Sequence, residues 1–161
     1  MNEQTLNEKI KSELLETLEE TFERHHGIFI DKGTSLFETL ENISVEEASI
    51  SISENAATVA AHAEHARFYL DVLESSMRGQ VEGKIDWREI WERIRAVSPD
   101  EWTATKRRLR ESYRLTTETI KTCDDFSDND IFGAALGVLA NTAYHLGAIR
   151  QTATLIKSAG K

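Results

Sequence analysis

The sequence predicts an all-α protein, a four-helix bundle with short helical insertions between its long helices. Apolar residues recur at steps of three and four along four long stretches, which is the pattern of helices that bury one face. The 161 residues include a single proline, so there are few breaks in helices. Only "ISIS" at 50–53 alternates like a strand, and it is too short to build a sheet.

Helix boundaries follow from capping residues and breaks. Ser98 is a strong N-cap because Pro99 occupies the first turn and Glu101 closes a capping box. Gly27 can take the left-handed conformation that ends the first helix, and Thr34 or Ser35 caps a short helix in the connector that follows. The long helices are expected at residues 3–24, 54–77, from 99 to the break at 124–130, and 129–158, with further short ones after Ser44 and at 85–94.

Composition narrows the class of protein. The length fits one domain spanning residues 1–161. The net charge of −9 argues against nucleic acid and anionic membrane surfaces as partners. The N-terminal stretch has no signal-peptide pattern, and the unbroken apolar run at 131–140 is too short to span a bilayer, so we expect a cytoplasmic protein. Because Cys123 is the only cysteine, an intramolecular disulfide is excluded. Cys123 also lacks the spacing to other residues that is typical of metal ligands.

Histidines on two of the expected helices point to a buried polar site. His62 and His65 lie about 60° apart around one helix, so both can lean to the same side. Asn141 and His145 are four residues apart on the last helix and therefore share a face. Bundle cores hold metal ions on side chains from facing helices, and imidazole is the commonest such ligand. A histidine satisfied by hydrogen bonds in the core is the alternative.

The stretch "TVAAHAEHARFYL" at 58–70, followed much later by "AYHLGAIRQ" at 143–151, resembles the DinB/YfiT-like superfamily of four-helix-bundle proteins. The segment at 85–112 is similar to a branch of that family with tryptophans before the third long helix. The resemblance covers nearly the whole chain.

The resemblance implies a divalent metal, often zinc or nickel, held by three histidines. Carried over, His145 is one ligand from the last helix, and His62 or His65 is the ligand from the second long helix. Asn141 stands where the family has its third histidine, and an amide oxygen is a poorer ligand for these metals. Three outcomes stay open: metal on His62, His65 and His145; weak metal on two histidines, Asn141 and water; or a polar pocket without metal.

The resemblance also implies a function. Such proteins include thiol-dependent transferases and isomerases, so we expect a metal-dependent hydrolase or transferase acting on an unknown small molecule, with homodimers formed through helix faces. The alternative is a non-catalytic binding or dimer-forming member whose metal site has decayed, which the asparagine at 141 favours.

The remaining features have plainer interpretations. The basic cluster "KRRLR" at 106–110 is expected to pair with nearby acids such as Asp100, Glu101 and Glu111. The three tryptophans are expected to pack the insertion against the bundle or to cover the pocket mouth. Arg150 and Gln151 either orient a ligand in the pocket or bond another helix. Three glycines inside the last helix are expected to permit close packing: Gly133, Gly137 and Gly147.

Overall fold

The computed structural model describes residues 2–80, 83–123, 126 and 129–160, and this part of the chain is all-helical. It contains seven helices: α1 (Glu3–Phe22), α2 (Leu36–Glu41), α3 (Val45–Ser49), α4 (Val59–Met77), α5 (Glu89–Arg93), α6 (Pro99–Thr122) and α7 (Asn129–Ala159). No strand occurs among the described residues, and "ISIS" is irregular. The prediction of an all-α protein is confirmed. The predicted break at 124–130 lies mostly outside the described residues.

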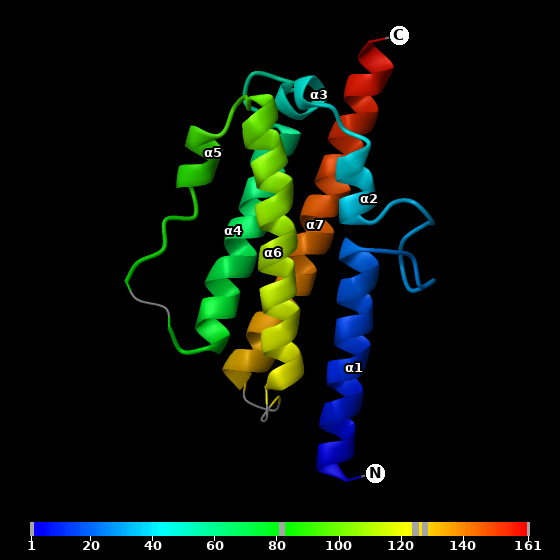
Figure 1. Ribbon diagram of the computed structural model, residues 1–161, viewed down its shortest axis with the longest axis vertical. Helices are drawn as coiled ribbons and strands as arrows, with labels where there is room; N and C mark the ends of the chain where they lie inside the picture. Colours follow the sequence, from blue (N-terminus) through cyan, green and yellow to red (C-terminus); the bar gives the residue numbers. More distant parts are fainter. Residues whose placement is uncertain (1, 81–82, 124–125, 127–128, 161) are drawn as a thin grey trace.

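The four longest helices run side by side in two directions (Figure 1). In that view α1 and α7 rise, and α4 and α6 descend. Because α4 and α6 point in the same direction, the segment between them runs back along the bundle beside α4, and this segment contains α5. Helix α4 packs most extensively against α7 and α6, whereas α1 has the slightest contacts of the four, with α7 and α6.

The helix starts are set by local capping, as the sequence predicts. Ser98, Ser44 and Ser35 each form a complete capping box with the glutamate three residues on, so Ser35 rather than Thr34 caps α2. The start of α4 was predicted five residues too early. Thr58 caps it by accepting a hydrogen bond from the Ala61 backbone N–H, and residues 54–57 precede the helix.

One predicted glycine contact is confirmed and two are wrong. A Cβ atom at Gly137 would lie 3.1 Å from Leu73 Cδ1, so α7 needs this glycine to approach α4 closely. A Cβ atom at Gly133 or Gly147 would meet nothing within 4 Å, because both lie on the exposed face of α7. Helix α7 is also the one helix in the described part that is long and apolar enough to cross a membrane by length and composition.

A buried carboxylate shapes the loop after α1. Glu20 is fully buried and accepts hydrogen bonds from the backbone N–H groups of Ile28, Phe29 and Ile30, at 2.8, 3.0 and 2.9 Å. Gly27 precedes them with φ of 88°, the left-handed conformation expected of it. The loop is thereby tied to the core although Phe29 itself is exposed.

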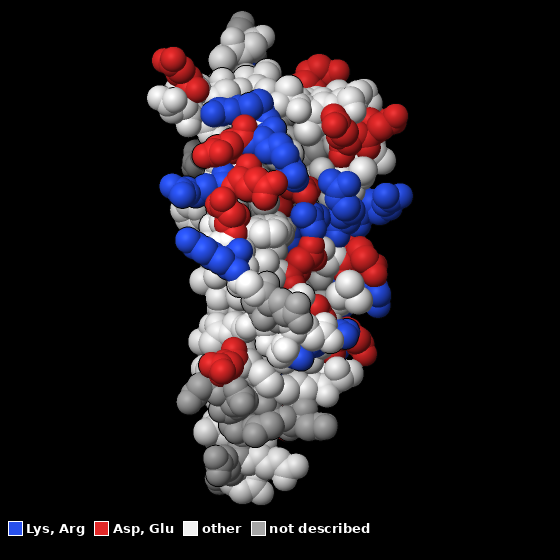
Figure 2. All heavy atoms as spheres, turned by 90° about the vertical axis from the view of Figure 1, so that its left-hand side faces the viewer, with Lys and Arg blue, Asp and Glu red and all other residues white. Residues whose placement is uncertain are grey.

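The basic cluster at 106–110 pairs with acids on other helices. Arg110 and Lys106 contact Glu41 of α2, and Arg108 contacts Glu64 of α4. The expected pairing with Asp100, Glu101 and Glu111 is wrong for these cations, because they reach across the helix packing instead of along α6. Figure 2, which views the molecule from the side of α5, shows positive and negative side chains interspersed over the upper part of that face.

Candidate metal centre between α4 and α7

Histidines from α4 and α7 meet, as the family resemblance implies. The Nδ1 atoms of His62 and His145 lie 3.0 Å apart, at hydrogen-bonding distance. The ring of His65 lies 4.9 Å from that of His145, centroid to centroid. His145 and His65 are buried, and His62 is partly exposed at the edge of the cluster. Gly137 favours this meeting, since it allows α7 to approach α4 two turns before His145.

Trp91 of α5 covers the cluster. Its ring stacks on His65 with centroids 4.4 Å apart and an interplanar angle of 22°. It also meets His62 edge-on at 5.4 Å and lies 5.9 Å from His145. Trp91 therefore packs the insertion against the bundle, one of the two roles expected of the tryptophans. Trp102 is a buried packing residue whose Nε1 donates to the Ile43 carbonyl.

Electrostatics keep the three imidazoles neutral. Burial, and then the proximity of His62 and His65, lower the pKa of His145 to about 3. Burial also lowers the pKa of His62, with a further contribution from His65, and burial lowers the pKa of His65. A hydrogen bond between two Nδ1 atoms requires one neutral ring protonated on Nδ1 and the other on Nε2. The cluster therefore offers uncharged nitrogens with available lone pairs, which is the form that binds metal.

Two polar atoms near this face have no partner. Among the buried side-chain atoms of the described residues, His65 Nδ1 and Asn141 Oδ1 make no hydrogen bond. Asn141 lies one turn before His145 on α7. Buried polar atoms are seldom left unpaired, so these two atoms are candidates to bind an ion or a water molecule. The carboxylate closest in sequence, Glu64, is engaged by Arg67 and Arg108 and offers no spare charge.

The donor set fits a divalent metal in part. Two nitrogen ligands on tetrahedral zinc lie about 3.3 Å apart, given zinc–nitrogen distances of about 2.05 Å. The 3.0 Å separation of the two Nδ1 atoms is close to that value. No group of three histidine, cysteine, aspartate or glutamate side chains in the described residues is arranged to hold an ion as it stands. A third ligand would come from a turned His65 or from Asn141.

Two other predicted residues lie elsewhere. Arg150 lines a small cavity of about 200 Å³ beside α2, together with Lys157. Gln151 is exposed. Neither residue contacts the histidine cluster, because a step of five or six residues along α7 turns the side chain to another side of the helix.

Comparison of the chain with protein-family models, with curated proteins and with solved structures finds no match.

Proposed function

We propose that this chain is a DinB/YfiT-like protein that holds a divalent metal, zinc or nickel, between α4 and α7 and acts on a small molecule. The reaction we propose is hydrolysis or thiol-dependent transfer. The observation that carries the proposal is the 3.0 Å approach of the Nδ1 atoms of His62 and His145 beneath Trp91. The assignment to the DinB/YfiT-like superfamily comes from the sequence resemblance.

The fold proposed is a four-helix bundle formed by α1, α4, α6 and α7. The support is their length and their two opposed directions, with α7 and α6 packed along α4. The segment with α5 is then the insertion between the second and third bundle helices. Its role in the proposal is to place Trp91 over the histidines.

His62 and His145 would hold the metal, and His65 and Asn141 would complete the ligand set. A bound metal would supply Lewis acidity, which lowers the pKa of a bound water or thiol. The protein contributes neutral imidazoles kept uncharged by burial, and an apolar cover in Trp91 that excludes bulk water. Ligation through both Nδ1 atoms would require each ring to carry its proton on Nε2, so the ring that donates in the hydrogen bond would change tautomer, its proton moving from Nδ1 to Nε2.

A non-catalytic member with a decayed site is the second candidate. It is favoured by Asn141 at the position of a ligand histidine, and by His65, which stacks on Trp91 while its Nδ1 makes no hydrogen bond. In that case the hydrogen bond between His62 and His145 is a core interaction, and the protein works through binding.

Metal content distinguishes the two candidates. Tag-free protein exposed to zinc or nickel and then desalted should retain about one metal per chain, measured by mass spectrometry, because the paired lone pairs are preorganised. His145→Ala should lose it. Asn141→His should bind at least tenfold more tightly, since imidazole replaces an amide oxygen.

The control variant is His26→Ala, in the loop after α1 and beside Glu19, which should keep the metal. Retention in His145→Ala would exclude this site. If the natural chain holds no metal but Asn141→His holds one per chain, the decayed site is supported. If neither protein holds metal, both the working and the decayed metal site are excluded.

We also propose a homodimer formed through the outer face of α7. Only 33% of the most apolar stretch of α7 is buried, so much of it faces outward. The outward face follows steps of three and four and carries no charge: Gly133, Leu136, Ala140, Tyr144, Gly147, Gln151 and Leu155. It extends about 33 Å along the helix. An uncharged face with glycines suits a second copy, because two-fold pairing sets each residue against its own surface and small residues admit close approach.

Replacing Leu155 or Leu136 by glutamate should convert the dimer to a monomer in light scattering at micromolar concentration. Leu155 is 52% exposed, so the folded monomer should tolerate the change, whereas a pair of copies would bury two like charges. Leu6→Glu on α1, 42% exposed, is the matched control and should leave the dimer intact. A natural protein that is monomeric under these conditions would rule out the dimer.

A further inference from the structure

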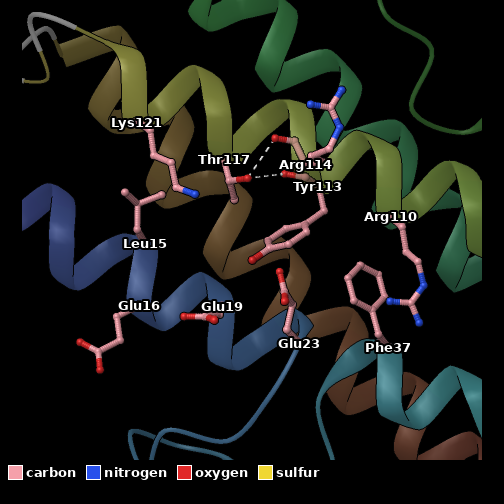
Figure 3. Close-up of a pocket in the computed structure, with 10 residues that line it drawn as sticks. All are labelled: Leu15, Glu16, Glu19, Glu23, Phe37, Arg110, Tyr113, Arg114, Thr117 and Lys121. Carbon is pink, nitrogen blue, oxygen red and sulfur yellow. Dashed lines mark hydrogen bonds between the residues drawn. The ribbon is translucent and has the colours of Figure 1, made fainter.

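A groove of about 510 Å³ runs between α1 and α6, which pack less closely than α4 does against α6 or α7 (Figure 3). One wall is acidic and comes from α1, with Glu16, Glu19 and Glu23. The other comes from α6 and carries cations, among them Lys121. The groove's volume lies in the range of sites for small molecules, about 300–1,000 Å³. It is separate from the histidine cluster, which lies between α4 and α7.

Opposite charges face each other here without pairing across the groove. On the basic wall, Arg110 is bound to Glu41 at 2.9 Å and Arg114 to Glu111 at 2.7 Å. On the acidic wall, Glu19 is bound to Arg24 at 2.7 Å.

Glu16 shares the acidic wall and lies 3.7 Å from His26. Two groups of the groove then remain without an ion pair among the described residues. They are the ammonium of Lys121 and the carboxylate of Glu23, one charge of each sign.

The two unpaired charges stand toward opposite ends of the groove. Figure 3 shows the phenol oxygen of Tyr113 directed toward the Glu23 carboxylate at one end, beside Phe37. Lys121 lies toward the other end, above Leu15. Burial and then the charge of Glu23 raise the pKa of the Tyr113 phenol, so it stays protonated. Tyr113 and Lys121 are eight residues apart on α6, which is about 12 Å along the axis.

The floor between the charges is largely apolar. The Tyr113 ring is 8% exposed and is held by stacking on Phe22 at 4.4 Å. The Thr117 hydroxyl is already used in hydrogen bonds to the carbonyls of Tyr113 and Arg114. The middle of the groove therefore offers contact surface but few free hydrogen-bonding groups.

We propose that this groove binds a zwitterion whose charges are about 10 Å apart, of the class of a short peptide of about three residues with an apolar central side chain. Its ammonium group would pair with Glu23, and its carboxylate with Lys121. An extended tripeptide spans about 10 Å, whereas a single amino acid cannot reach both charges. The inference is independent of the proposed metal site.

Titration calorimetry with the tripeptide Ala-Leu-Ala tests the proposal. The free peptide should bind, and blocking either end, by N-acetylation or C-amidation, should weaken binding about tenfold because one charge pair is lost. Glu23→Gln should weaken binding of the free peptide about tenfold while leaving the acetylated peptide unchanged. Lys121→Gln should likewise weaken binding of the free peptide about tenfold while leaving binding of the amidated peptide unchanged. Free leucine should bind more weakly than the tripeptide.

The control variants are Glu118→Gln and Lys9→Gln, which make the same charge changes at exposed positions of α6 and α1 outside the groove. They should leave all affinities unchanged. A dissociation constant above about 10 mM for the free peptide would overturn the proposal. So would equal binding of blocked and free peptides, or equal effects of the control and groove variants.

Discussion

Replacing Glu20 by alanine should lower the free energy of unfolding by about 3 kcal/mol or more, since a hydrogen bond to a charged group contributes about 1.5–3 kcal/mol and three are lost. The fully buried carboxylate accepts from Ile28, Phe29 and Ile30, and without it their N–H groups lose this acceptor. Urea denaturation measures the change. For a chain of this size, the melting temperature should fall by about 10 °C.

Glu19→Ala is the matched control. Glu19 is the next carboxylate on α1, partly exposed and paired with Arg24, so its loss should cost less than about 1 kcal/mol. Equal losses in the two variants would contradict a special role for Glu20. Burial by itself would raise the pKa of Glu20, but the hydrogen bonds from Ile30, Phe29 and Ile28 together hold that pKa below its usual value. Its contribution should thus be present above about pH 4.5 and disappear on further acidification, and Glu20→Ala should lack this step.

Local signals in the sequence were sufficient for most helix boundaries. A serine followed three residues later by glutamate predicts a capping box at Ser44 and at Ser98, and both occur. For α2 the sequence allows Thr34 or Ser35 as the cap, and the structure has Ser35. The start of α4 was misplaced although Thr58 is a residue type favoured at N-caps, because the alanines at 56 and 57 just before it also suit a helix. The role of Glu20 could not be predicted, because its partners are backbone groups placed only by the folded loop.

The candidate site was predictable to a similar extent. Spacing indicated that His62 and His65 lean to one side of their helix and that His145 shares a face with Asn141, whereas the pairing of the two helices at one site was implied by the family resemblance; the histidines of the two helices do meet. The stacking of Trp91 on His65 depends on how the segment between α4 and α6 returns, which no periodicity encodes. For Arg150 the sequence allows two roles, orienting a ligand in the pocket or bonding another helix. The rotation of successive side chains around α7 places it away from His145, in the cavity beside α2.

Acidification should destabilise the metal-free protein well above the range in which carboxylates titrate. In the unfolded chain a histidine takes up its proton near pH 6.5, whereas the pKa of His145 in the fold is about 3, because of burial and then of His62 and His65. Between these values the unfolded state binds more protons, so stability rises with pH and is lost as pH falls. At pH 5 His145 alone accounts for a loss of about 2 kcal/mol relative to pH 7.5. The lowered pKa values of His62 and His65 act in the same direction.

Urea denaturation of chelator-treated protein at a series of pH values between 7.5 and 4.5 measures this dependence. His145→Met should reduce the slope by up to about 1.4 kcal/mol per pH unit, the value for one proton. Normalising each protein to its own stability at pH 7.5, where the imidazoles are neutral in both states, removes the packing change from the comparison. Equal slopes for the two proteins would mean that His145 takes up its proton in the fold as readily as in the unfolded chain. The cluster would then be open to water, and the neutral lone pairs that the proposed metal site needs would not be protected by burial.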